Sequence, residues 1–157
     1  MPETRIARFA DVPARNPFDR PGVVRPERFQ TNQERQLGRA TGIDQFGVNH
    51  VTLGPGDYSS LRHWHEGEDE FVFVLSGELV LIDDNGEHAL GPGDSAGFKA
   101  GVGNAHHLAN RSSAPAIYLA IGTRKRGEER IHYPDDPERP LGVVVRREDG
   151  ERLKKPD

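Results

Sequence analysis

Two histidines separated by one residue stand in the segment RHWHEGEDE, residues 62–70. In an extended strand, side chains two positions apart face the same way, about 7 Å apart along the chain. His63 and His65 would therefore project together, and two imidazoles can share one metal ion at about 2.0–2.1 Å from each nitrogen. Glu70 begins the apolar run EFVFVL and is in phase with its two valines. The pattern indicates a candidate metal site made of His63, His65 and Glu70.

The same segment permits a simpler interpretation. Two histidines beside acidic residues are compatible with a solvated strand edge, where the carboxylates oppose aggregation. Three acidic residues fall in the turn before Glu70, where we expect solvent to hold them: Glu66, Glu68 and Asp69. A second histidine pair, His106-His107, favours the metal interpretation because it offers a further imidazole. Adjacent residues of a strand face opposite sides, so only one of this pair can point inward.

A general acid or base is not identified by the sequence. Four residues near these segments carry suitable or charged groups: Tyr58, Arg62, Lys99 and Tyr118. Strand alternation places Arg62 on the face opposite His63, and a packing or surface role is the simpler interpretation for all four. The sequence therefore assigns no catalytic residue, and the catalytic group is unknown from the sequence.

Short apolar segments separated by glycine and proline turns must position the candidate ligands. Strands are predicted at residues 46–53, 58–65, 70–75, 78–83, 87–90, 95–100, 106–110 and 116–122. Asn85-Gly86 predicts a two-residue hairpin turn with positive φ at both central positions. No segment shows convincing helical periodicity. Many short strands with regular turns are typical of an antiparallel sandwich or small barrel.

Composition excludes several classes of protein. The chain has 157 residues, a formal charge of −4 and no cysteine. A disulfide scaffold, a thiolate metal site and a cysteine nucleophile are therefore excluded. The one basic cluster, residues 123–130, contains two glutamates and resembles no nucleic-acid surface. We see neither the apolar core of a signal peptide nor a run that could span a bilayer, so we expect a cytoplasmic protein.

Residue composition divides the chain into three parts. Residues 1–40 are polar and rich in proline and arginine, and we interpret them as an N-terminal arm. Residues 41–122 form the predicted barrel core. Residues 123–157 form a charged C-terminal extension that packs on the barrel or is partly flexible, with one strand-like island, LGVVV, at 141–145. Because exposed sheet edges favour being covered, we expect a homodimer with the arm crossing to its partner or wrapping its own barrel.

Residues 56–110 resemble the paired motifs of the cupin superfamily. The first motif is matched in residue type and spacing by His63, His65, Glu70 and Gly77. The second is matched by Gly93-Asp94, Gly101, His106 and Asn110. Three departures affect turns: Asp57 stands where the family has glycine, Lys99 stands where proline is usual, and two extra residues lie between Gly101 and His106. The asparagine spacing favours His106 over His107 as a ligand.

This resemblance implies an all-β double-stranded β-helix, or jelly-roll barrel, containing one divalent metal. The implied ligands are His63, His65, Glu70 and His106. Nitrogen and oxygen donors do not distinguish Zn, Mn, Fe, Ni and Co. The resemblance further implies a metal-dependent enzyme acting on a small polar metabolite, of isomerase, epimerase, lyase or dioxygenase type. The alternative is a non-catalytic small-molecule-binding module whose metal is structural or docks the ligand. Neither nucleic acid nor a membrane is an expected partner.

Overall fold

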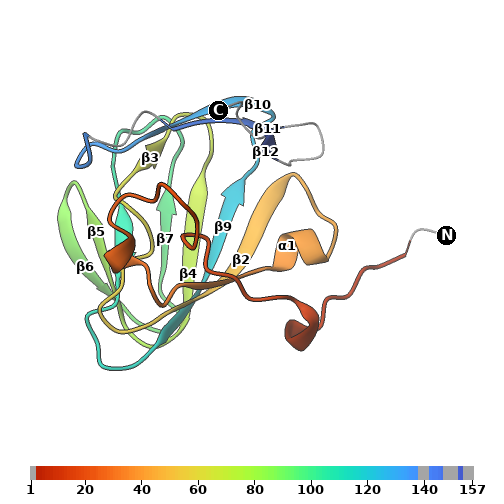
Figure 1. Ribbon diagram of the computed structural model, residues 1–157, viewed down its shortest axis with the longest axis horizontal. Helices are drawn as coiled ribbons and strands as arrows, with labels where there is room; N and C mark the ends of the chain where they lie inside the picture. Colours follow the sequence, from red (N-terminus) through yellow and green to blue (C-terminus); the bar gives the residue numbers. More distant parts are fainter. Residues whose placement is uncertain (1–2, 138–141, 147–151, 154–157) are drawn as a thin grey trace.

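A computed structural model describes residues 3–137, 142–146 and 152–153. The chain folds into antiparallel sheets that curve into a barrel (Figure 1). One sheet has the order β1 (Gln33–Gln36), β2 (Phe46–Leu53), β9 (Ala116–Thr123), β4 (Glu70–Ser76), β7 (Ser95–Phe98). A second has the order β6 (Gly86–Leu90), β5 (Leu79–Asp83), β8 (His107–Ala109). The third has the order β12 (Arg152–Leu153), β11 (Gly142–Arg146), β10 (Gly127–His132), β3 (Trp64–His65). The predicted all-β jelly roll is confirmed.

Helical structure in the described chain is short. It comprises the single turn α1 (Leu37–Ala40) and two 3-10 turns, Phe9–Asp11 and Pro26–Arg28. None of these is long or apolar enough to cross a membrane. The sheets therefore carry the architecture.

Alternating apolar residues of the strands fill the barrel. Val72 and Val74 of β4 are buried. Phe71, which precedes Val72 and faces the other side of the strand, is 40% exposed. The buried cluster contains Val51, Leu53, Val72, Val74, Leu79, Leu81, Leu108, Ala116 and Tyr118. Tyr118 shares its face of β9 with Ala116, which shows which side of that strand points inward. Glu70 opens the same inward row of β4 and so begins at the rim of the core.

The β5–β6 hairpin turns one residue earlier than predicted. Asp83 pairs with Gly86, so Asp84 and Asn85 are the central residues. Neither has positive φ, and Gly86 instead adopts φ 126°. The prediction of Asn85-Gly86 as the turn is wrong because the Asp83 carboxylate accepts the N–H of Asn85 at 2.9 Å, which closes the chain before the glycine.

Asp83 also joins this hairpin to the loop that leads to His106. Its Oδ2 accepts a hydrogen bond from Asn104 Nδ2 at 3.1 Å, and its side chain is 10% exposed. Burial would raise the pKa of Asp83, but hydrogen bonds from Asn104, Asn85 and His88 lower the pKa to about 2. The ionised carboxylate therefore stabilises the folded protein.

We expect Asp83→Asn to lower the free energy of unfolding at neutral pH by up to about 2 kcal/mol. Because the folded pKa lies below the ordinary 3.8, this stabilisation is present above pH 3.8 and disappears as the pH falls towards 2. Urea unfolding of both proteins from pH 7 to pH 3 measures it. The gap between them should shrink by roughly half near pH 3, and a gap that does not change over this range contradicts the assignment.

Part of the N-terminal segment packs on its own barrel. β1 pairs with the edge of β2, and the Phe29 side chain is 1% exposed. Thr31 donates through its backbone N–H and its hydroxyl to Asp57, and Asn32 donates to the carbonyl of Tyr58. The red and orange segment before β2 crosses the barrel in Figure 1.

The residues after β9 return to the barrel in β10. This strand pairs with β3, placing Ile131 opposite His65, and both Glu129 and Ile131 are buried. Beyond β10, Asp135 binds Arg62 and Asp136 binds Arg25 of the N-terminal segment. The predicted strand-like island corresponds to β11, apart from residue 141, which lies outside the described residues. β10 therefore brings part of the C-terminal extension beside the histidine strand.

Candidate metal centre

Three histidines surround the carboxylate of Glu70. His63 and His65 come from the segment that ends in β3, and His106 directly precedes β8. Backbone hydrogen bonds link His63 and His106 in both directions, which fixes these two residues side by side. The Nε2 atom of His106 lies 2.7 Å from Glu70 Oε2, and that of His63 lies 3.5 Å from the same oxygen. The Nε2 atom of His65 lies 3.4 Å from Glu70 Oε1.

The other ring nitrogen of two of these histidines is held by the backbone. His63 Nδ1 lies 2.9 Å from the carbonyl of Leu61, and His106 Nδ1 lies 3.0 Å from the carbonyl of Asn104. A carbonyl can only accept, so each Nδ1 carries a proton; each Nε2 faces Glu70, to which it donates a hydrogen bond when protonated, and in the neutral Nδ1–H tautomer it presents a lone pair instead. This tautomer is the one that a metal-binding imidazole needs.

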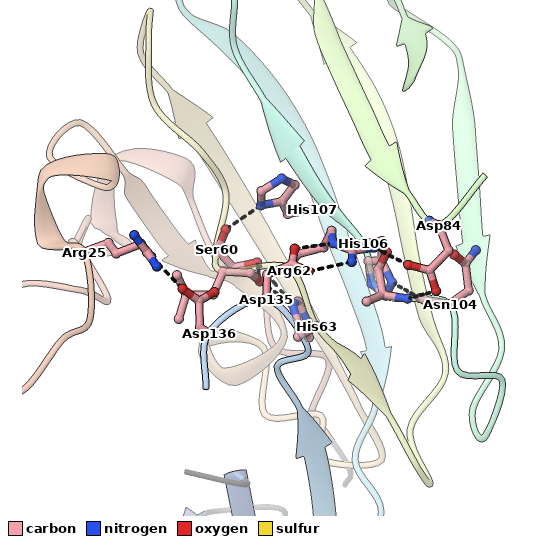
Figure 2. Close-up of polar contacts among 12 residues, drawn as sticks. Arg25, Ser60, Arg62, His63, Asp84, Asn104, His106, His107, Asp135 and Asp136 are labelled. Atoms are coloured by element: carbon pink, nitrogen blue, oxygen red, sulfur yellow. Dashed lines mark hydrogen bonds and ion pairs between the residues drawn. The ribbon is translucent and has the colours of Figure 1, made fainter. Parts of the chain in front are cut away.

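His107, which follows His106, points to Ser60 and Tyr58. His107 Nδ1 lies 2.9 Å from the carbonyl of Ser60, and its ring packs against Tyr58 with centroids 5.0 Å apart. Figure 2 shows His107 directed to Ser60 while His106 is directed to a separate group of residues. Burial, together with nearby cations, lowers the pKa of His107, which therefore favours the neutral ring. Of the adjacent pair, only His106 faces Glu70.

The site favours negative charge on Glu70 and positive charge around it. Burial would raise the pKa of Glu70, but hydrogen bonds from His106, His63 and His65 hold the pKa well below its ordinary value. Burial would likewise lower the pKa of His65, yet Glu70, Glu68 and Glu129 raise it. A metal cation bound between the histidines would take the place of the protons on their Nε2 atoms, because the same carboxylates stabilise positive charge there.

The donor set fits a divalent metal. One donor atom each from His63, Glu70 and His106 lies within 4.8 Å of the others. Imidazole nitrogens with one carboxylate suit zinc, manganese, iron, nickel or cobalt. His65 lies outside this tightest group and faces the second oxygen of Glu70. The predicted residues thus come together, with His65 on the side nearest β10.

Two buried carboxylates lie behind His65. Glu68 is 4% exposed, so the prediction that solvent holds it is wrong, whereas Glu66 and Asp69 are exposed as expected. Glu68 turns inward because its Oε1 accepts the backbone N–H of Lys125 at 3.0 Å. Glu129 is 1% exposed, with Oε1 3.3 Å from His65 Nδ1. No motif pointed to Glu129, and its phase with Ile131 was the only available signal.

The candidate ligands open into a cavity of about 690 Å³. Phe18 and Phe29 of the N-terminal segment form part of its wall, as do Phe98 and Tyr133. Four arginines also line it: Arg15, Arg20, Arg39 and Arg124. The space is sufficient for a small metabolite, and the lining combines apolar surface with cationic groups.

The four residues considered for proton transfer are placed differently. Tyr118 lines the cavity from within the core, and burial raises its pKa. Tyr58 packs on His107, away from Glu70. Arg62 is bound by Asp84, Asp135 and the carbonyl of Ala105, so it ties segments together on the outer face (Figure 2). Lys99 borders a smaller pocket of about 190 Å³.

Comparison with solved structures gives strong matches. The crystal structure of a sugar phosphate isomerase of the cupin superfamily from Silicibacter pomeroyi is 38% identical, with a TM-score of 0.77 and 98% of each chain covered. A structure from Acidithiobacillus ferrooxidans is 29% identical, with a TM-score of 0.65, covering 78% of this chain and 74% of that one. The polyketide cyclase RemF from Streptomyces resistomycificus is 22% identical, with a TM-score of 0.63 over 94% and 90%, and shows the fold alone.

Sequence comparison agrees with these structures. A search of curated proteins finds no match. The family model of the cupin domain matches residues 49–122, which include all four candidate ligands and the strands that carry them. Together with 38% identity over nearly the whole chain, this match is decisive. The chain belongs to the cupin superfamily.

Proposed function

We propose that this protein is a metal-dependent enzyme acting on a small polar metabolite, with isomerisation of a sugar phosphate as the first reaction to test. The observation that carries the proposal is the convergence of three imidazoles and one carboxylate at the edge of a cavity of about 690 Å³. In this proposal the metal ligands are His63, His65, Glu70 and His106.

A divalent metal, when bound, would polarise a carbonyl or hydroxyl oxygen of the substrate. The residues of the chain would supply the rest. The three histidines and Glu70 hold the centre, and the aromatic wall of the cavity limits the access of water. Tyr133 lines the same cavity with its ring centroid 6.0 Å from that of His63, and its phenol is a group that can hold or move a proton.

The choice of a sugar phosphate has two supports. The Silicibacter pomeroyi protein, 38% identical over 98% of both chains, is a sugar phosphate isomerase. The cavity is lined by Arg15, Arg20, Arg39 and Arg124. Guanidinium groups pair with phosphate oxygens through two parallel hydrogen bonds. Arg15 is also paired with Glu34 at 2.8 Å, so part of this charge is balanced within the protein.

The first experiment is elemental analysis of protein purified without a metal-affinity tag. We expect about one equivalent of a single divalent metal in the wild type and its loss from the double variant His63→Ala/His65→Ala. The metal-loaded protein is then incubated with aldose and ketose phosphates in deuterated water. Isomerisation by proton transfer gives new sugar signals and carbon-bound deuterium by NMR, and chelator-treated protein should give neither.

The outcomes separate the candidate functions. A protein that contains no metal and binds none on titration rules out the metal-dependent enzyme. A metal-loaded protein that the sugar phosphates stabilise against heat without turnover supports the alternative, a non-catalytic binding module. Turnover that survives removal of the metal contradicts the role proposed for the four ligands.

A further inference from the structure

The feature of interest is a pair of buried polar atoms beside the candidate metal centre. Among the described residues, His65 Nδ1 and Glu129 Oε2 are the buried side-chain atoms that make no hydrogen bond. They belong to neighbouring side chains, since Glu129 Oε1 lies 3.3 Å from His65 Nδ1. The Glu129 side chain is 0% exposed and that of His65 is 9% exposed. Burying a polar atom that has no hydrogen-bond partner costs free energy, so we expect each of these atoms to gain a further partner.

His65 differs from His63 and His106 in the group that its Nδ1 atom contacts. The backbone holds Nδ1 of His63 and His106, through the carbonyls of Leu61 and Asn104. No backbone carbonyl holds Nδ1 of His65, and the carboxylate of Glu129 occupies the equivalent position at 3.3 Å. That separation is within hydrogen-bond reach, so reorientation of the ring rather than movement of the chain would complete the bond.

We propose that Glu129 is the positioning residue of His65, accepting the Nδ1 proton so that Nε2 faces the metal as a ligand. The inference rests on the metal centre proposed above. Carboxylates that accept the outer N–H of a metal-bound histidine fix its tautomer and orientation. Here the carboxylate comes from β10, which pairs with β3 and places Ile131 opposite His65.

The contacts of Glu129 with Gly67 and His65 explain why its side chain is buried. Oε1 accepts a hydrogen bond from the backbone N–H of Gly67 at 3.2 Å, which holds the carboxylate in place. This one backbone donor leaves Oε2 without a hydrogen-bond partner. A histidine that donates to Glu129 while binding a cation on its other nitrogen supplies a second donor and places positive charge beside the carboxylate.

Glu68 offers a matched control. Its Oε2 lies 4.0 Å from the same Nδ1, beyond hydrogen-bond reach, and it is nearly as buried as Glu129. Glu68→Gln and Glu129→Gln therefore each remove one negative charge near His65. Glu129→Leu additionally removes the acceptor oxygen, whereas Glu129→Gln retains one.

The test is the affinity of each full-length protein for Zn²⁺ alone, by competition with a chromophoric chelator. We expect Glu129→Leu to bind about 10–100-fold more weakly than wild type. Glu129→Gln should lose less than about tenfold, and Glu68→Gln should stay within about twofold. Circular dichroism and thermal unfolding of the metal-free proteins show whether each variant is folded. Equal affinity of Glu129→Leu and wild type overturns the proposal, and so does an equal loss in Glu68→Gln and Glu129→Leu.

A spectroscopic measurement on unaltered protein keeps the test decisive if Glu129→Leu fails to fold. Long-range ¹H–¹⁵N correlation spectra of the Zn²⁺-loaded wild type should show His65 protonated at Nδ1 and metal-bound at Nε2. Metal on Nδ1 overturns the proposal. A wild type that binds no Zn²⁺ removes the metal centre and this inference together, whereas tight binding that is insensitive to Glu129 removes only the role of Glu129.

Discussion

Replacing His106 by alanine is expected to weaken the binding of a divalent metal by more than about 100-fold, whereas replacing His107 leaves it within about twofold. Changes to groups behind a ligand cost about 10–100-fold in affinity, and loss of the ligand itself costs more. His106 Nε2 lies 2.7 Å from Glu70 Oε2, whereas His107 donates to Ser60 and packs on Tyr58. Competition for Zn²⁺ with a chelator measures both variants.

His107→Ala is expected to cost stability rather than metal affinity. His107 is buried, and His107→Ala removes a ring packed on Tyr58 as well as the hydrogen bond to Ser60. We expect a loss of about 2 kcal/mol in the free energy of unfolding of the metal-free protein. Equal loss of metal affinity in both variants, or a greater loss in His107→Ala, would show that the adjacent histidines have been assigned to the wrong roles.

The proximity of His63, His65 and Glu70 could be predicted from the sequence because local strand geometry governs it. His63 and His65 share a face through the two-residue repeat, and Glu70 leads the inward row of β4 through the same repeat. The choice of His106 over His107 came from the motif, and the structure places only His106 near Glu70. These inferences required no knowledge of distant contacts.

Residues whose roles depend on distant pairing could not be predicted. Glu68 was expected in solvent because it stands in an acidic turn, yet it accepts the backbone N–H of Lys125, 57 positions away. Glu129 reaches His65 only because β10 pairs with β3. A single charged strand in a polar tail carries no signal for such a pairing. The positions of strands were easier to predict than the contacts between them, and β2 has the predicted bounds. The β5–β6 turn lies one residue earlier than predicted because of a side-chain hydrogen bond.

A departure from the cupin motif acquires a structural explanation at Asp57. The family places glycine there, but this carboxylate is 7% exposed and accepts two hydrogen bonds from Thr31, from the backbone N–H at 2.5 Å and the hydroxyl at 2.6 Å. Thr31 stands two residues after Phe29, which is buried and forms part of the cavity wall. Asp57 therefore fastens the N-terminal segment over the candidate site.

Restoring the family residue with Asp57→Gly should release that segment. We expect the free energy of unfolding to fall by about 2–4 kcal/mol, since two hydrogen bonds to a charged acceptor are lost and a flexible glycine is introduced. Urea unfolding measures the loss. Limited proteolysis with trypsin should cleave faster after Arg28, which precedes Thr31 in the same segment and, unlike Arg20 and Arg25, is not followed by proline. Asp57→Asn, which keeps an acceptor oxygen, should lose roughly half as much.

A double-mutant cycle with Thr31→Val isolates the contact. If Asp57 acts through the Thr31 hydroxyl, the two substitutions together should cost about 1 kcal/mol less than the sum of their separate costs, because both remove the hydroxyl–carboxylate hydrogen bond, whereas the bond from the backbone N–H is lost only in the Asp57 variant. Zn²⁺ affinity should stay within a few-fold of wild type throughout, since none of the four proposed ligands contacts Thr31 in the described structure. Additive costs, or tryptic cleavage at the wild-type rate, would show that the contact between Asp57 and Thr31 does not hold the segment in place.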